Sequence, residues 1–149
     1  MNPPLNRADL IALCGRLPDS YEDYPFDDPN WTVMRHRTNR RSYALIFERQ
    51  GRLWVNVKAE PAWGDFWKQT YPAVVPAYHM NKRHWIGIVL DGSMTADQIF
   101  DLIAESYRLT APPNPAELAD FPELSREACI FLWKKLPERL CQCLRYAMI

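Results

Sequence analysis

Hydrophobic and polar residues alternate along several short stretches of the chain, which is the pattern of β-strands with one buried face. Five stretches are strand candidates: residues 31–37 and 52–58 follow this pattern, and residues 42–48, 74–78 and 85–90 are short, mostly apolar runs. The connections between the first three stretches are only a few residues long, which favours antiparallel hairpins. The pattern therefore predicts an antiparallel sheet built from a series of short strands.

Three other stretches repeat apolar side chains every three or four residues, the period of a helix lying on a core. The first is expected to begin after Asn6, a favourable N-cap residue, and the second at Pro61, which suits a first helical turn. The third is expected to begin at Thr95, because Thr95 and Gln98 have the spacing of a capping box. Strand and helix periods in one chain predict a domain of the α+β class.

Two segments between these elements carry many aromatic or acidic side chains. The second helix has aromatic residues at helical spacing, namely Trp63, Phe66, Trp67 and Tyr71, and we expect this stripe to face the core. Residues 19–30 combine acidic, aromatic and proline residues without a clear period, and we expect them to form a loop.

The composition changes after Ala111, where residues 112–115 include three prolines and form a stiff break. We expect residues 1–111 to form the α+β domain and residues 112–149 to form a helical C-terminal extension packed on the same domain. The extension is apolar on more than one side. It is therefore either deeply buried or a contact surface for another protein or a second copy of the chain.

The bulk composition is that of a folded, soluble protein. Hydrophobic residues make up 48% and aromatic residues 13% of the 149 residues, which argues against disorder. The longest apolar run, residues 86–90, is too short to cross a bilayer, so we expect no membrane association. The chain starts without a basic segment followed by an apolar one, and its four cysteines are irregularly spaced. We therefore expect a cytoplasmic protein with reduced thiols.

Charge is unevenly distributed along the chain, although the formal net charge is zero. Residues 31–90 carry ten basic and three acidic side chains, whereas residues 1–30 and residues 91–149 are each net acidic. The middle third of the chain is therefore basic and lies between two acidic ends. This distribution of charge is a better guide to binding partners than the isoelectric point of about 6.8.

A dense motif occupies residues 76–85, Pro-Ala-Tyr-His-Met-Asn-Lys-Arg-His-Trp. It is followed by an apolar strand, a turn at Asp91-Gly92 and a helix that ends in Glu105-Ser-Tyr107. Upstream stand Tyr21-Glu-Asp-Tyr-Pro-Phe26 and the strands described above. With these features the chain resembles the MmcQ/YjbR family of small bacterial proteins from about Leu5 to Leu109.

The resemblance implies a CyaY-like (frataxin-type) sandwich, in which helices pack on one face of a twisted antiparallel sheet. It also implies DNA binding through basic hairpins in a double-wing arrangement. Residues 112–149 exceed the usual length of the family.

Two groups of basic residues are the candidate nucleic-acid contacts. They lie on or beside the connections of the predicted sheet: Arg35, Arg37, Arg40, Arg41, Lys58, Lys82 and Arg83. Arginine binds phosphate bidentately and lysine as a point charge, so two cationic tips on a sheet suit a phosphate backbone. We therefore predict a non-catalytic DNA-binding protein. The alternatives are solvated charges that keep edge strands apart, or a protein-interaction or homo-oligomeric adaptor.

A further set of candidates lies in the turn of the family motif: Tyr78, His79, Asn81, His84 and Trp85. Two histidines are an incomplete ligand set for zinc, and Cys141 and Cys143 are distant in sequence, so we expect no metal. We interpret the turn residues as orienting the turn through hydrogen bonds. The chain has no glycine-rich phosphate loop, nucleophile elbow or HExxH motif, and we expect neither a cofactor nor enzyme activity.

Overall fold

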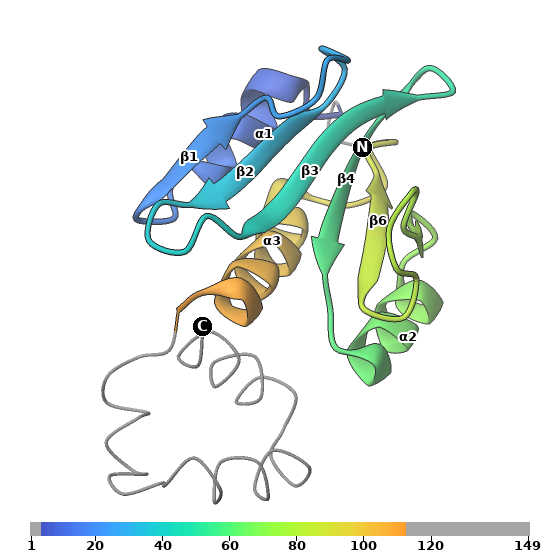
Figure 1. Ribbon diagram of the computed structural model, residues 1–149. Coiled ribbons are helices and arrows are strands. Elements are labelled where there is room, and N and C mark those ends of the chain that lie inside the picture. Colours follow the sequence, from blue (N-terminus) through green and yellow to red (C-terminus); the bar gives the residue numbers. More distant parts are fainter. Residues whose placement is uncertain (1–3, 113–149) are drawn as a thin grey trace, which may run out of the picture. The chain divides into compact units, whose positions relative to one another are not determined.

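The computed structural model describes residues 4–112, which form an α+β domain with one six-stranded antiparallel sheet (Figure 1). The strands are β1 (Ser20–Asp23), β2 (Thr32–His36), β3 (Ser42–Arg49), β4 (Arg52–Lys58), β5 (Val74–Pro76) and β6 (Trp85–Val89), in the order β1-β2-β3-β4-β6-β5. The helices are α1 (Arg7–Cys14), α2 (Pro61–Thr70) and α3 (Ala96–Thr110). The predicted fold class is thus confirmed. The expected helical extension at residues 112–149 lies almost entirely outside the described residues.

The helices begin where the capping residues predict. The Asn6 side chain accepts a hydrogen bond from the Asp9 N–H at 2.8 Å, and the Asp9 carboxylate accepts one from the Asn6 N–H at 2.9 Å. Thr95 and Gln98 make the same reciprocal pair at 3.0 and 3.2 Å, and Pro61 is the first residue of α2. Each pair satisfies two N–H groups that a helix start leaves without partners.

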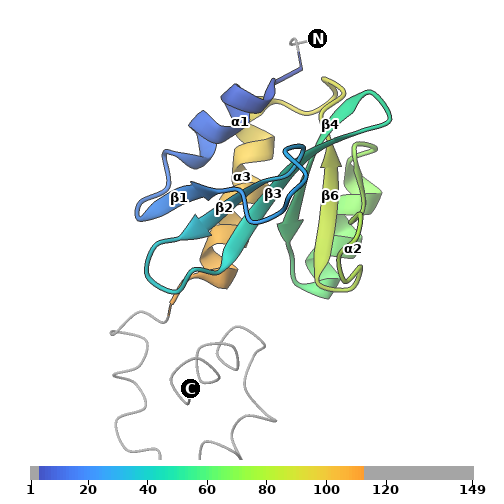
Figure 2. The same ribbon diagram turned by 45° about the horizontal axis from the view of Figure 1, so that its top comes forward.

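All three helices cover the same face of the sheet, which Figure 2 shows from a second direction. The side chains of β4 and β6 that point to this face are fully or almost fully buried: Val55, Val57, Ile86 and Ile88. They form one core with α1 and α3, including Leu10 and Ile103. Within the described residues, no helix is both long and apolar enough to cross a membrane.

A serine from α3 completes the sheet where its pairing is irregular. The β2–β3 pairing shifts between Met34 and Arg35, so Tyr43 has no partner on β2. The Ser106 hydroxyl donates to the Tyr43 carbonyl at 2.6 Å and accepts from the Lys58 N–H at 2.8 Å. Ser106 therefore joins the start of β3 to the end of β4.

One segment expected to be a loop contains a strand. Residues 20–23 pair with β2 as the edge strand β1, with Asp23 opposite Val33. The acidic, non-alternating sequence concealed this strand, because an edge strand needs only backbone pairing on one side and tolerates polar residues.

The aromatic stripe of α2 does not face the core as a whole. Trp63 and Phe66 are 53% and 48% exposed, whereas Trp67 and Tyr71 pack partly against the core. The helix approaches the sheet through Gly64, where an added Cβ would lie 3.3 Å from the Ile86 side chain. Because α2 contacts the sheet on the side of Gly64, the side chains of Trp63 and Phe66 are left exposed to solvent.

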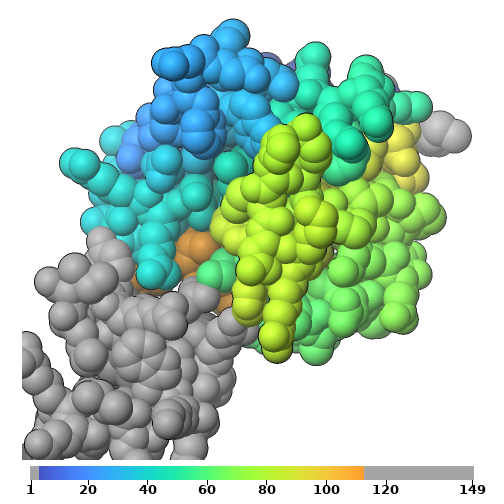
Figure 3. Space-filling model, turned by 45° about the vertical axis from the view of Figure 1, so that its right-hand side comes forward, coloured from blue at the N-terminus to red at the C-terminus, as the bar shows by residue number. Residues whose placement is uncertain are grey.

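The second face of the sheet carries no helix, and we call it the open face. Residues directly opposite each other on neighbouring antiparallel strands share a face. The open face therefore carries Asp23, Val33, Leu45, Asn56 and Gly87, which lie in one row across five strands. Two segments lie over it. One is formed by residues 24–31, and the other is the connection between β5 and β6, which forms the yellow-green ridge in Figure 3.

Candidate functional site

Most of the predicted cationic residues gather at one end of the sheet. Strands β2 and β4 end there, and β3 and β6 begin there, because Arg35 lies opposite Ser42 and Lys58 opposite Trp85. The β2–β3 turn and the turn before β6 therefore lie at the same end of the sheet, with the end of β4 between them (Figure 1). We call the following set the cationic end: Arg37, Arg40, Arg41, Lys58, Lys82 and Arg83.

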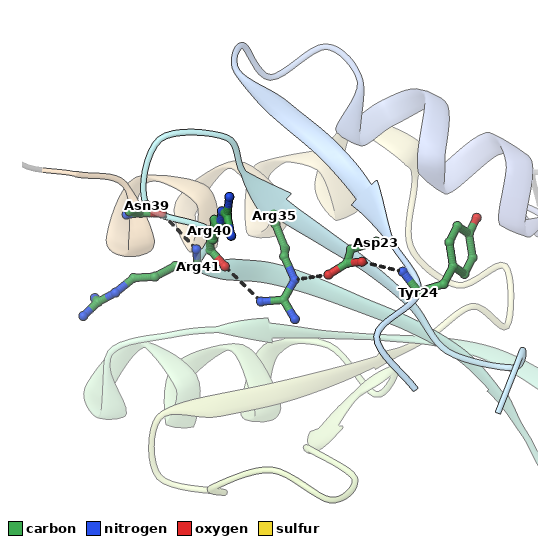
Figure 4. A network of polar contacts seen from close by, with 6 residues as sticks. All are labelled: Asp23, Tyr24, Arg35, Asn39, Arg40 and Arg41. Carbon is green, nitrogen blue, oxygen red and sulfur yellow. Dashed lines mark hydrogen bonds and ion pairs between the residues drawn. The ribbon is translucent and has the colours of Figure 1, made fainter. Parts of the chain in front are cut away.

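Arg35 has a different position from the rest. Its guanidinium donates to the Asp23 carboxylate at 2.7 Å and to the Arg40 carbonyl at 2.9 Å (Figure 4). It is half-buried on the open face and connects β1, β2 and the turn after β2. These contacts give Arg35 a structural role, so we do not count it among the cationic end.

The β2–β3 turn is held from two sides. The Asn39 side chain is almost fully buried, donates to the carbonyl of Thr110 in α3 at 2.9 Å and accepts from the Arg41 N–H at 2.9 Å. Arg40 has a φ of 60°, in the left-handed region, and its side chain is exposed. These contacts hold the backbone of the turn against the end of α3.

The other exposed arginine of this turn lies over β1. The guanidinium of Arg37 is 5.6 Å from the ring centroid of Tyr21, in a cation–π contact. The Arg37 N–H also donates to the Asp19 carbonyl at 2.7 Å. The edge strand that the sequence did not reveal therefore positions one of the predicted basic residues.

The turn before β6 is built around Asn81, as predicted. Its side-chain oxygen accepts from the N–H groups of Arg83 at 2.9 Å and His84 at 3.3 Å. This arrangement leaves the Lys82 and Arg83 side chains exposed, while His84 and Trp85 are half-buried. Hydrogen bonding by Asn81 thus orients the second cationic turn.

The motif residues Tyr78 and His79 lie over the open face and not at the cationic end. Their rings are 3.9 Å apart, and His79 has a φ of 58°, which is uncommon for a residue other than glycine. The Tyr78 carbonyl accepts a 2.8 Å hydrogen bond from the Asn56 side chain. Asn56 is fully buried, and its side-chain oxygen has no partner among the described residues.

A pocket of about 370 Å³ opens beside these residues on the open face. Its walls come from three parts of the chain: Phe26, Asp28 and Trp31 from one loop, Leu45 from β3, and His79 and Met80 from the other loop. The Trp31 ring stacks on Phe47 with centroids 4.3 Å apart. Sequence reasoning missed this pocket; its only signal was the mixture of acidic and aromatic residues in the segment 19–30.

Cys14 and His36 are among the buried titratable groups on the helix side of the sheet. Burial raises the pKa of the Cys14 thiol to about 12, which disfavours the nucleophilic thiolate form at neutral pH. The His36 ring is 1% exposed and lies 2.8 Å from the Thr110 hydroxyl. Within residues 4–112, no three histidine, cysteine or acidic side chains lie close enough together to hold a metal ion.

Comparison with known proteins places this architecture in a family of small α+β domains. The YjbR family model matches residues 15–109, and the chain belongs to the YjbR family. It is 31% identical to YyaQ of Bacillus subtilis (strain 168), over 71% of this chain and 98% of that protein. It is 27% identical to YjbR of Escherichia coli (strain K12), over 74% of this chain and 91% of that protein.

Solved structures agree with this assignment. The crystal structure of the DUF419 domain protein DR2400 from Deinococcus radiodurans is 32% identical, with a TM-score of 0.67 over 83% of this chain and 92% of that one. A crystal structure of a protein from Pseudomonas syringae is 30% identical, with a TM-score of 0.65 over 72% of this chain and all of that one. The names of these relatives specify no ligand or activity.

Proposed function

We propose that the cationic end binds the phosphate backbone of nucleic acid, DNA above all, without reading its sequence. The observation that carries the proposal is the strand register, which brings two cationic turns from distant parts of the chain to the same end of the sheet. Phosphate contacts of this kind supply sequence-independent affinity. The proposal assigns the protein no catalytic role.

The structure of the two turns favours such binding energetically. Arg37, Arg40, Lys82 and Arg83 have exposed side chains on turns whose backbones are fixed by hydrogen bonds. A fixed backbone leaves less conformational entropy to be lost on binding than a mobile tip does. Two acidic residues border this end among the described residues: the Asp19 carbonyl bonds the Arg37 N–H, and Glu60 follows Lys58 by two positions.

The test removes one charge from each turn. Arg40→Asn suits the left-handed backbone at this position better than alanine does, and Arg83→Gln leaves the backbone contact with Asn81 in place. A matched control, Arg49→Gln with Arg52→Gln, removes the same charge from the β3–β4 connection at the opposite end of the sheet. Binding to a 20-base-pair duplex is measured by fluorescence anisotropy from about 50 to 200 mM salt, a range in which phosphate contacts weaken strongly.

We expect the slope of log affinity against log salt to fall by about 1.8 in the double variant, since each phosphate contact contributes about 0.9. The control should keep the wild-type slope. Two results would overturn the proposal: no binding by the wild-type protein at the lowest salt, or the same slope in the double variant and the control.

A second candidate function, contact with another protein or a second copy of the chain, is favoured by α2. Trp63 and Phe66 are both about half exposed, lie on one helix and touch each other edge to face at 5.6 Å. An apolar contact of this kind depends little on salt, in contrast to phosphate binding. Association that persists at high salt and is lost on changing Trp63 and Phe66 to serine would support this function.

A further inference from the structure

The pocket on the open face is separate from the cationic end in both position and chemistry. It lies over Leu45 in the middle of β3, and its walls include aromatic rings, aliphatic side chains and one carboxylate. Neither lysine nor arginine lines it. Its volume of about 370 Å³ falls within the range of about 300–1,000 Å³ that is usual for small-molecule sites.

The pocket wall includes one carboxylate, that of Asp28, together with the imidazole of His79, while Arg7 bonds to Asn30 and Arg49 lies over the Tyr78 ring. Asp28 forms part of the wall, and Asp27 precedes it on the same exposed loop. The Asp28 carboxylate accepts a hydrogen bond from the Asn30 N–H at 2.9 Å, and among the described residues no ion pair involves Asp28. A cation in the pocket would therefore be attracted by the Asp28 carboxylate.

The aromatic walls of the pocket also favour a positively charged ligand. A cation within about 6 Å of an aromatic ring face is attracted by the ring. The open face already shows this chemistry, because the Arg49 guanidinium lies 4.3 Å from the Tyr78 ring centroid and 5.2 Å from that of Trp54. The pocket offers Phe26 and Trp31, whose centroids are 6.1 Å apart and nearly perpendicular.

We infer that this pocket binds a small organic cation, an ammonium group carried on an apolar body. Phe26 and Trp31 would contact the ammonium group together with Asp28, and Leu45 and Met80 would contact the apolar body. This inference does not depend on the nucleic-acid proposal, since the two sites use different residues and attract opposite charges.

The experiment compares three probes that share an indole ring and differ in charge: tryptamine, indole-3-ethanol and indole-3-propionate. Binding to the full chain is measured by calorimetry and by amide and indole chemical shifts in NMR spectra. We expect tryptamine to bind about fivefold or more tightly than the neutral indole-3-ethanol, with shifts centred on Trp31 and Met80. Indole-3-propionate should bind most weakly.

Two variants test the walls. Asp28→Asn removes the charge but keeps the oxygen that accepts from Asn30, and it should weaken tryptamine binding about three- to fivefold. Phe26→Leu removes an exposed ring and should weaken binding about two- to fivefold. Asp101→Asn, an equal charge change on an exposed position of α3, should have no effect. Thermal melting checks that each variant is folded.

Several outcomes would overturn the inference. Among them are no tryptamine binding at millimolar concentration, equal affinity for the charged and neutral probes, and equal losses in the Asp28 and Asp101 variants. Chemical shifts centred away from the pocket would do the same. Tryptamine binding should also survive the Arg40 and Arg83 changes, so that failure of one proposal leaves the other standing.

Discussion

Replacing Ser106 with alanine isolates the hydrogen bonds that join α3 to the sheet. The Ser106 side chain is fully buried, and its single hydroxyl serves both the Tyr43 carbonyl and the Lys58 N–H. The substitution removes one oxygen atom and leaves both backbone groups without that partner. Because the volume change is small, the loss of stability reports on unpaired polar groups more than on packing.

The expected loss is about 2–4 kcal/mol, since each buried group left unpaired costs about 1–3 kcal/mol and the Lys58 N–H is only partly buried. Urea unfolding followed by tryptophan fluorescence should show a midpoint lower by about 1–2 M at the usual dependence on urea. Ser93→Ala is the matched control. Its hydroxyl also donates at 2.6 Å, but to the exposed Asp91 carboxylate, and we expect a loss within about 0.5 kcal/mol.

A Ser106 loss no greater than that of Ser93 would refute this reasoning. It would mean that water or a local shift of α3 satisfies the Tyr43 carbonyl without the serine.

Two other predictions concern His36 and the exposed rings of α2. Burial lowers the pKa of His36; a hydrogen bond with the Tyr107 backbone raises it, and the nearby Arg41 charge lowers it to a smaller extent. Because the net effect is a lowered pKa, the unfolded chain binds a proton at His36 more readily than the folded chain does. Stability should therefore fall as the pH drops through 6.5 and below, by at most about 1.4 kcal/mol for each pH unit. The test compares urea midpoints at pH 7.5 and pH 5.5, and the difference between them should be smaller in His36→Gln than in the wild type. Changing Trp63 and Phe66 to serine should lower the free energy of unfolding by less than about 1 kcal/mol, whereas Phe47→Ala should lower it by about 3–5 kcal/mol. Thermal unfolding measures both losses, and losses of similar size would contradict the observed exposure of Trp63 and Phe66.

The sequence predicted those parts of the fold that depend on local interactions. The hydrogen bonds of Asn6 and Thr95 lie within one helical turn, and β3 and β4 are short runs of mostly apolar residues that are buried on both faces, so both leave a pattern in the sequence. Strand β1 left none, because an edge strand pairs on one side only and tolerates the acidic, non-alternating residues found there. The orientation of α2 depends on the close approach of Gly64 to Ile86, which no periodicity can reveal.

The candidate sites divide in the same way. The two cationic turns are continuous in sequence, and their basic residues could be named in advance, whereas the role of Arg35 depends on Asp23 twelve residues away. The pocket joins residues from three separate segments, and Leu45 looks in the sequence like any other buried strand residue. A site assembled by tertiary packing from common residue types carries no local signature.

The Asn39–Thr110 hydrogen bond makes the position of the β2–β3 turn depend on the length of α3. One residue inserted into α3 would rotate everything after it by about 100° and advance it by about 1.5 Å, which takes the Thr110 carbonyl out of reach of Asn39. Exposed residues of α3 can be exchanged without this effect, but its length cannot be changed. Insertions and deletions in a helix that lies behind the sheet would therefore displace Arg40 and Arg41, although neither residue belongs to that helix.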